Sequence, residues 1–184
     1  PSGGIFAPTI RWHDGVFYMV TTNVSCGGNF YVSATDPAGE WSDPIYVDQA
    51  GIDPSLLFDD DGKVYFLSNG NRAPPSRWGC LSNVTRSISG NIRTGKKLAP
   101  TRSTWRGTGG RYPEAPHLYK IDGMYYMMIA EGGTEYGHME TIARSASPYG
   151  PWEPSPRNPI LTNRNTEADM PIQATGHADL VQTQ

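Results

Sequence analysis

The chain has 184 residues, of which 37% are apolar, 21 are glycine and 16 are proline. This composition supports a buried core but argues against long helices, and 15 basic against 18 acidic residues give a net charge of −3, which provides no electrostatic case for nucleic acid or an anionic membrane as a partner. No apolar run approaches the roughly 18 residues that span a bilayer, so a neutral, polar partner is expected.

The predicted elements form a repeated pair of strands joined by a tight turn. Apolar first strands close to a proline are expected at residues 7–12, 53–58, 114–119 and, near the C-terminus, 176–181. Second strands follow three Asp-Gly pairs, which begin at Asp14, Asp61 and Asp122. Asp-Gly between apolar runs predicts a hairpin, because glycine accepts the positive φ that tight turns require. The repeated unit is therefore a hairpin.

Two of these units also end alike, which extends the repeat beyond the hairpin. The segment Ser33–Trp41 matches Ser145–Trp152 and suggests a shared outer turn closed by a packed indole. Repeats of roughly 40 to 50 residues with several short strands are typical of β-propeller blades. A β-sandwich is the alternative, but it does not require the matched order of strands and turns. We expect an all-β fold and about three blades of an incomplete propeller.

One stretch departs from the pattern. Between Gly62 and Pro113 the chain has no Asp or Glu, while Lys and Arg are frequent. A nucleic-acid-binding patch is one interpretation, but aromatic residues among the basic ones are limited to Trp78 and Trp105, and neither lies in a recognisable binding module. A solvated loop is favoured.

Three smaller sequence features are assigned no catalytic, metal-binding or phosphate-binding role. The run Asp59–Asp61 precedes Gly62 in a predicted turn, so solvated turn residues are favoured over a metal site. The glycine-rich segment 107–110 lacks the Lys-Ser/Thr pair of a phosphate-binding loop. For Cys26 and Cys80, two free and partly buried thiols are favoured over a disulfide, although the sequence alone leaves pairing open.

Candidate chemistry lies at the starts of the predicted first strands. In a propeller these strands line the axis, so Asp53, Glu114 and His177 should gather at one end of the channel despite their separation in sequence. Cleaving an acetal requires a proton donor for the leaving oxygen and a second carboxylate on the other face. The longer side chain of Glu114 suits the donor role.

Each of these residues also has a purely structural interpretation. Asp53 can initiate a turn before proline, and Glu114 can be a surface carboxylate paired with Arg111. His177 can be a core histidine or an ion ligand, since one histidine is not a metal motif. His117, on the same strand as Glu114, is expected to be structural.

Five segments together resemble glycoside hydrolase family 43, in particular its β-xylosidase and α-arabinofuranosidase members. The matching segments, in chain order, are residues 4–11, 51–58, 109–119, 130–138 and 175–181. The resemblance implies a five-bladed propeller that cleaves xylosidic or arabinofuranosidic bonds with inversion of configuration. A retaining propeller glycosidase such as an invertase or sialidase is disfavoured, because no Arg-Asp-Pro motif or regular Asp-box spacing is present.

The resemblance also implies roles for individual residues. Glu114 takes the position of the general acid, and Asp53 that of the residue that orients the acid and tunes its pKa. His177 matches the histidine of the central cavity, which in some members helps to hold an ion or the substrate. Phe6 lies where many members place a tryptophan that stacks on the sugar. Together with Arg111, Phe6 and His177 are the candidate substrate-binding residues.

The family's general base is an aspartate of the first blade, in a Pro-Asp-Pro-Ser type of motif that is not found here. Residues 1–184 are therefore expected to be part of a catalytic propeller domain, without the first blade and without the C-terminal closure. Xylo-oligosaccharide or arabinoxylan is the expected substrate, with no nucleic-acid or membrane partner. No cofactor is expected to be required, although Ca²⁺ could occupy the central cavity. A secreted or extracellular location is favoured over a cytoplasmic one. The alternative function is a non-catalytic carbohydrate-binding or inactive truncated propeller.

Overall fold

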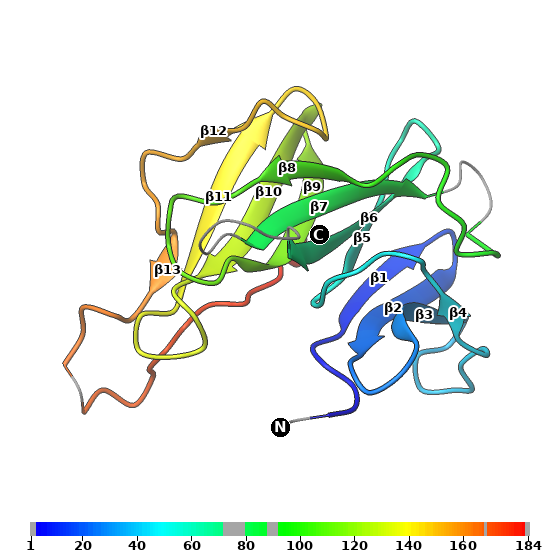
Figure 1. The fold of residues 1–184 in the computed structure, drawn as a ribbon, viewed down its shortest axis with the longest axis horizontal. Coiled ribbons are helices and arrows are strands. Elements are labelled where there is room, and N and C mark those ends of the chain that lie inside the picture. Colours follow the sequence, from blue (N-terminus) through cyan, green and yellow to red (C-terminus); the bar gives the residue numbers. More distant parts are fainter. Residues whose placement is uncertain (1–2, 72–79, 88–91, 168, 183–184) are drawn as a thin grey trace.

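The computed structural model describes residues 3–71, 80–87, 92–167 and 169–182, and the regular structure in this part of the chain is β-strand. The strands form three antiparallel sheets that follow one another along the chain (Figure 1). Across these described ranges we find no helix long and apolar enough to cross a membrane. The prediction of an all-β fold with about three blades is confirmed.

The first sheet has its strands in sequential order: β1 (Thr9–His13), β2 (Val16–Asn23), β3 (Gly28–Ala34) and β4 (Ile45–Tyr46). A two-residue turn joins β1 to β2, with φ of 48° at Asp14 and 80° at Gly15. Positive φ at both central residues is the requirement of a type I′ turn, whose twist matches that of the strands it joins. The predicted Asp-Gly hairpin is correct at this position.

The second sheet contains β5 (Ser55–Phe58), β6 (Val64–Asn71), β7 (Cys80–Ser87) and β8 (Arg102–Trp105). Its first turn is wider than the other two. The Gly62 amide donates to the Asp59 carbonyl at 3.0 Å, and the Asp59 amide donates to the Lys63 carbonyl at 2.9 Å. Only Gly62 has positive φ there, at 76°. The hairpin was predicted correctly, but the turn is not the two-residue type.

The third sheet contains β9 (Glu114–Ile121), β10 (Met124–Glu131) and β11 (Met139–Ser145), with the short strands β12 (Glu153–Pro154) and β13 (Leu161–Thr162) both pairing with β11. A two-residue Asp122-Gly123 turn joins β9 to β10. In the first and third sheets, the matched segments ending at Trp41 and Trp152 connect the third strand to the fourth. Trp152 packs against the core, as predicted for an outer turn.

The prediction of a solvated loop between Gly62 and Pro113 is wrong for much of that stretch. Residues 80–87 (β7) pair with β6, and residues 102–105 (β8) pair with β7, so both are strands of the second sheet. The sequence of both strands is mostly polar and shows little apolar alternation, and β7 is a strand because it pairs with the apolar strand β6. Residues 72–79 and 88–91 lie outside the described ranges.

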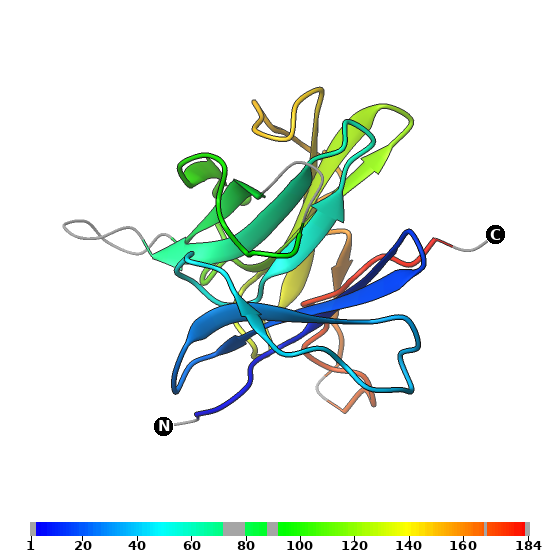
Figure 2. The same cartoon turned by 90° about the vertical axis from the view of Figure 1, so that its right-hand side faces the viewer.

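The predicted fourth first strand is also not formed. Residues 176–182 have no strand pairing within the described chain, and they run beside β1 and β9, held by side-chain contacts (Figure 2). Figure 2 shows this C-terminal segment next to the N-terminal sheet. The segment therefore joins the first sheet to the third without extending either.

The core consists of two apolar clusters between neighbouring sheets. Strand β6 contributes to both, because alternate side chains point to opposite faces of a strand: Val64 and Phe66 pack toward the first sheet, and Tyr65 and Leu67 toward the third. Strand β5 contacts both β1 and β9. The first strands of the three sheets are therefore neighbours in space, which is the arrangement that brings their N-terminal ends together.

Candidate active site

The structure brings three predicted site residues together. Asp53 lies two residues before β5, Glu114 is the first residue of β9, and His177 lies in the C-terminal segment. The carboxyl of Glu114 interacts electrostatically with both Asp53 and His177. Packing of β5 against β9 accounts for this meeting of residues that are far apart in sequence. The predicted convergence at one end of the first strands is therefore observed.

Asp53 is a buried carboxylate, only 6% exposed. Its carboxyl accepts a hydrogen bond from the amide of Ala115, the residue after Glu114. Burial raises the pKa of Asp53 to about 6, and the Ala115 bond opposes that rise. Its Oδ2 atom is buried without a hydrogen-bond partner among the described residues. The side chain therefore reaches across to the neighbouring sheet and does not serve as a solvated turn initiator.

Glu114 combines partial burial with access to solvent. Its side chain is 17% exposed, and the Thr134 hydroxyl lies 3.4 Å from Oε1. Burial, followed by the negative charge of Asp53, raises the pKa of Glu114, whereas His177 and His138 act to lower it. Within the described chain Glu114 makes no polar contact with Arg111, so the alternative of a surface ion pair is wrong. A raised pKa favours the protonated carboxyl that a general acid needs.

Two histidines border Glu114. His177 is half-buried, and burial, together with a smaller effect of His138, lowers its pKa, while Glu114 acts to raise it. His138 is 3% exposed, and its Nε2 lies 4.0 Å from Glu114 Oε1. The sequence pattern indicated no role for His138, although this residue stands at the end of one of the matching family segments.

The backbone is strained where these residues meet. Asp53, Ala115 and His177 all adopt left-handed conformations, with φ of 52°, 49° and 53°. Left-handed backbone is disfavoured for residues with a Cβ atom and persists where the surroundings enforce it. At Ala115 the strain accompanies an irregularity in the pairing of β9 with β10, between Met128 and Ala130. The three chain segments of the site therefore share one unusual backbone feature.

The loop that leads into Glu114 is organised around a fully buried carboxylate, Glu131 at the end of β10. Glu131 accepts hydrogen bonds from the backbone amides of Thr108, Gly109 and Gly110, and from the hydroxyls of Thr108 and Thr141. A Cβ atom on Gly110 would approach the Glu131 Cβ to 2.7 Å, so glycine is needed for this contact. The glycine-rich segment thus binds an internal carboxylate.

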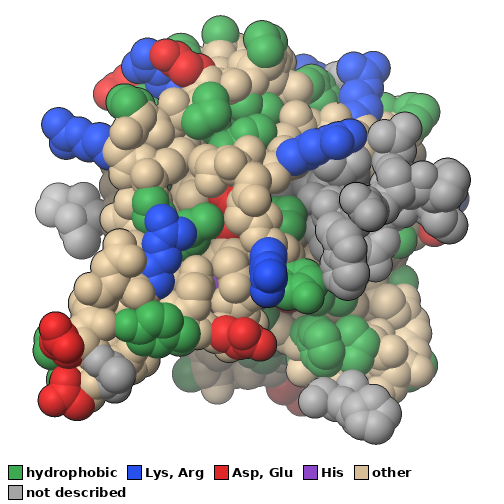
Figure 3. All heavy atoms as spheres, turned by 60° about the vertical axis from the view of Figure 1, so that its left-hand side comes forward, with side chains coloured by type: hydrophobic (Ala, Val, Ile, Leu, Met, Phe, Trp, Pro, Cys, Tyr) green, Lys and Arg blue, Asp and Glu red, His purple; other side chains and the backbone are tan. Residues whose placement is uncertain are grey.

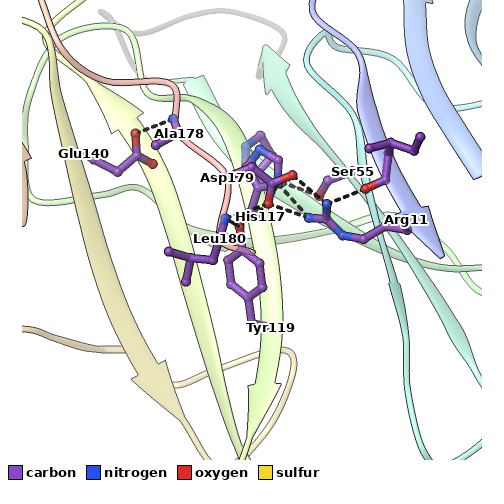
Figure 4. Close-up of polar contacts among 10 residues, drawn as sticks. Arg11, Ser55, His117, Tyr119, Glu140, Ala178, Asp179 and Leu180 are labelled. Atoms are coloured by element: carbon purple, nitrogen blue, oxygen red, sulfur yellow. Dashed lines mark hydrogen bonds and ion pairs between the residues drawn. The ribbon is translucent and has the colours of Figure 1, made fainter. Parts of the chain in front are cut away.

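A polar network joins β1, β9 and the C-terminal segment, close to the site (Figure 4). Arg11 donates to both carboxylate oxygens of Asp179 at 2.6 and 3.0 Å, and Tyr119 donates to the same carboxylate at 2.6 Å. Arg11 also donates to Nδ1 of buried His117 at 3.0 Å. Burial lowers the pKa of His117 to about 4. A neutral His117 can accept this bond, which fits its predicted structural role.

Glu140, at the start of β11, also holds the C-terminal segment in place. Its Oε2 accepts a hydrogen bond from the Ala178 amide at 3.0 Å, and Glu140 is 1% exposed (Figure 4). Burial raises the pKa of Glu140 to about 7, while the backbone amides of Ala178 and His177 oppose the rise. The residue next to His177 is thus fixed by a buried carboxyl group that the sequence pattern did not single out.

Within the described part of the chain, neither Phe6 nor Arg111 makes a hydrogen bond or ion pair with Glu114. Phe6 is half-buried, its amide donates to the Thr22 carbonyl, and its carbonyl accepts from the Thr21 hydroxyl. Arg111 is exposed, and its carbonyl accepts from the Gly132 amide at 2.7 Å. Their roles in substrate binding stay predictions.

The acidic run at 59–61 is not simply a solvated turn. Asp59 is buried, accepts hydrogen bonds from Lys120 Nζ at 2.8 Å and Tyr125 Oη at 2.5 Å, and so joins the second sheet to the third. Across the described residues, no group of three or more His, Cys, Asp or Glu side chains could hold a metal ion.

Two remaining expectations concern thiols and surface charge. Cys26 is free, as favoured, but exposed, which corrects the expectation of partial burial. The side chain of Cys80 is not among those described. On the face shown in Figure 3, Lys and Arg side chains stand apart among hydrophobic and uncharged ones. Among the described residues of this face there is therefore no continuous basic surface.

The comparison with known families gives one match over the entire sequence. The family model described as "Glycosyl hydrolases family 43" matches residues 1–184. The chain is 50% identical to a xylosidase/arabinosidase of Butyrivibrio fibrisolvens over 188 residues, which cover 98% of this chain and 36% of the relative. It is also 50% identical to a non-reducing end alpha-L-arabinofuranosidase of Bacteroides ovatus, covering 98% of this chain and 32% of the relative.

Solved structures agree with these matches. A Bacteroides ovatus xyloglucan-locus protein aligns with a TM-score of 0.84 and 48% identity, covering 100% of this chain and 34% of that chain. A xylan beta-1,4-xylosidase from Bacillus halodurans aligns with a TM-score of 0.86 and 37% identity, covering 100% and 36%. The chain thus spans about a third of the relatives it matches. The fold is part of a five-bladed β-propeller, as predicted.

Proposed function

The chain belongs to glycosyl hydrolase family 43, and from this premise we propose that residues 1–184 form part of the catalytic propeller of an inverting glycosidase. The proposed substrates are xylosidic or arabinofuranosidic bonds in xylo-oligosaccharides or arabinoxylan. The names of the relatives support this substrate class, since they include a xylosidase/arabinosidase and an arabinofuranosidase. One observation carries the proposal: Glu114 is a partly exposed carboxyl whose pKa is raised by burial and by the adjacent Asp53.

In the proposed mechanism Glu114 donates its proton to the glycosidic oxygen as the bond to the anomeric carbon breaks. Asp53 acts on Glu114 in two ways. Its negative charge raises the pKa of Glu114, and its hydrogen bond from the Ala115 amide fixes the backbone next to the acid. A water molecule attacks the opposite face of the sugar, activated by a carboxylate about 6.5 to 9.5 Å from the acid. We propose that the general base is contributed by another part of the complete enzyme.

Two other features of the proposal concern ions and location. The proposed steps use protein groups and water, and a Ca²⁺ ion in the central cavity stays a prediction. A secreted or extracellular location also stays a proposal, and fractionation of the producing cells would test it.

The test is the hydrolysis of aryl β-xylosides and α-arabinofuranosides by the complete enzyme and its Glu114→Gln variant. For phenyl glycosides, whose leaving group needs protonation, kcat should fall by about 10²- to 10⁴-fold, the usual contribution of general acid catalysis. Hydrolysis of 2,4-dinitrophenyl glycosides should change little, because dinitrophenolate leaves without a proton. NMR of the first product should show an inverted anomeric centre.

The control is Glu153→Gln, which alters an exposed carboxylate paired with Arg144 at the outer edge of the third sheet. This variant should retain full activity. Equal loss on both classes of glycoside in Glu114→Gln would argue against a general acid. Sugar binding without hydrolysis in the complete protein would favour the alternative of a non-catalytic carbohydrate-binding propeller.

A further inference from the structure

A second titratable side chain, His138, lies at Glu114 and has no role in the proposed mechanism. It precedes β11, and its backbone is fixed on both sides: its amide donates to the Glu135 carbonyl at 2.9 Å, and its carbonyl accepts from the Thr162 hydroxyl at 2.8 Å. The residue is 3% exposed. Its imidazole is therefore held in the interior.

Hydrogen bonding determines which ring nitrogen of His138 carries the hydrogen. Nδ1 lies 3.1 Å from the carbonyl oxygen of Ala174. Since a carbonyl oxygen can only accept, Nδ1 must be the donor, and in the neutral imidazole Nε2 then presents a lone pair. This Nε2 is buried without a hydrogen-bond partner among the described residues, and Glu114 Oε1 is 4.0 Å away. Buried polar atoms are rarely left unpaired, so a partner for Nε2 is expected.

The C-terminal segment also sets the plane of the ring. A Cβ atom on Gly176 would lie 2.6 to 2.8 Å from ring atoms of His138, which is too close for any side chain. Glycine therefore lets the segment pack directly on the imidazole, while Ala174 holds Nδ1. The same segment carries His177, the other histidine that acts on Glu114. His138 is thus oriented from one side and faces the acid from the other.

We propose that His138 is a positioning residue for Glu114, whose protonated carboxyl donates a hydrogen bond to the bare Nε2. The inference rests on the proposed function of Glu114 as general acid. A rotation of the partly exposed Glu114 side chain closes the 4.0 Å separation, and hydrogen bonds of catalytic groups are often long before substrate binds. The bond holds the acidic proton in one orientation until the leaving oxygen takes it, and Glu114 is then left as a carboxylate.

The surroundings of Glu114 are compatible with this role. Burial and the charge of Asp53 favour its protonated form, and Thr134 contacts Oε1. His177 and His138 oppose protonation when they carry positive charge. Neutral His138 has the opposite effect, because an acceptor for the acidic proton stabilises the protonated carboxyl. Loss of Nε2 should therefore lower the pKa of Glu114.

The test uses two substitutions in the complete enzyme, each of which keeps one half of the ring's polar groups. In His138→Asn the amide nitrogen can replace Nδ1 as donor to Ala174, but nothing replaces Nε2. In His138→Gln the longer amide can place an acceptor near the position of Nε2. The measurements are the pH dependence of kcat/KM and the rates for phenyl and 2,4-dinitrophenyl glycosides.

For His138→Asn, the basic limb of the profile should move to lower pH, and kcat for phenyl glycosides should fall roughly 10- to 100-fold, as for a misplaced catalytic group. Hydrolysis of dinitrophenyl glycosides should stay close to wild type. His138→Gln should recover part of the loss. Equal losses on both substrates with an unmoved basic limb, or a limb moved to higher pH, would overturn the proposal.

Two further results make the outcome unambiguous. If Glu114→Gln loses no activity on phenyl glycosides, the proposed function fails. If Glu114→Gln loses activity but His138→Asn retains the wild-type pH dependence of kcat/KM, only the proposal for His138 fails. Nitrogen-15 NMR of the otherwise unchanged enzyme requires no His138 variant to fold. It should show an unprotonated Nε2 whose resonance shifts in Glu114→Gln, and a protonated Nε2 with a bare Nδ1 would contradict the proposal.

Discussion

At the scale of single residues, the site contains a carboxylate that is costly to bury. The pKa of Asp53 is raised by burial to about 6, above the usual value near 3.8. A carboxyl whose pKa is higher in the folded state binds its proton more tightly when folded. Its contribution to stability is therefore present at low pH and lost as pH rises through about 4 to 6. Above that range the buried charge opposes folding.

Asp53→Asn should therefore raise the free energy of unfolding at pH 7.5, by about 3 kcal/mol from the size of the pKa shift. Asparagine tolerates the left-handed backbone of this position, so the substitution adds little strain. Urea unfolding at pH 7.5 and pH 4 measures the effect, which should be small at pH 4. Activity should fall, because the charge that acts on Glu114 is lost.

Asp59→Asn is the matched control, because Asp59 is also buried but is paired with Lys120 and Tyr125. Removing one partner of a buried pair leaves the other unsatisfied, so this variant should be less stable than wild type. Destabilisation of similar size in both variants would show that Asp53 is held by contacts that outweigh its burial.

At the scale of elements, the loop before β9 depends on one side chain. Glu131 accepts hydrogen bonds from three backbone amides and two hydroxyls, and the absence of a Cβ atom at Gly110 lets the loop approach Glu131 closely. Replacing the carboxylate by an amide turns one acceptor into a donor that faces other donors. We expect Glu131→Gln to lower the free energy of unfolding by about 3 kcal/mol, because buried donors then lose the carboxylate that accepts their hydrogen bonds.

In Glu131→Gln the loss of stability should be largest in the loop before β9, in addition to the lower free energy of unfolding of the whole protein. Hydrogen exchange of the amides of Thr108, Gly109 and Gly110 should accelerate in Glu131→Gln more than that of the strand amides of β10. Glu153→Gln removes an exposed ion pair with Arg144 and should change neither exchange nor unfolding measurably. Uniform acceleration throughout the third sheet would mean that Glu131 supports the whole sheet and not the loop.

At the scale of the molecule, the sheets meet through polar groups near the axis as well as through apolar cores. Arg11, Asp179 and His117 join the first sheet, the C-terminal segment and the third sheet (Figure 4). The hydroxyl of Ser55 donates to the Pro116 carbonyl at 2.5 Å and links the second sheet to the third. These bonds fix the ends of the first strands and hence the relative positions of the site residues.

The sequence predicted those features that depend on local chemistry or on the repeat. The turns at Asp14 and Asp122 follow from the positive φ of Asp-Gly pairs, and the meeting of Asp53 with Glu114 follows from equivalent positions in two repeats. The family resemblance added the expected roles. Agreement between local propensity and global pattern is what makes such features predictable.

The features that were missed depend on partners distant in sequence. Asp59 is buried because Lys120 and Tyr125, 61 and 66 residues away, satisfy its carboxylate. Glu131 is buried because a loop about 22 residues earlier surrounds it with amides. Neither partner set can be inferred from the residues next to the carboxylate. Strand β7 was missed because its order derives from pairing with β6.

The number of protons that buried groups bind on folding determines how the free energy of unfolding of the whole molecule changes with pH. Burial raises the pKa of Asp53 to about 6 and that of Glu140 to about 7, so each binds a proton more tightly on folding. Burial lowers the pKa of His117 to about 4, so His117 releases a proton on folding. The shifts of Glu114 and His177 are opposite in sign, so their effects on proton binding oppose each other. Near pH 5.5, folding should therefore take up about one net proton.

A net uptake of about one proton means that the free energy of unfolding should fall by about 1 kcal/mol per pH unit between pH 5 and 6. Urea unfolding at half-unit intervals measures this slope. Asp53→Asn removes one group that takes up a proton and should leave the slope close to zero. His117→Gln removes the group that releases one and should make the slope about twice as steep, even if the variant is less stable at every pH. A slope of opposite sign in the unmodified protein would mean that His117 and the network around Arg11 outweigh the two buried carboxyls.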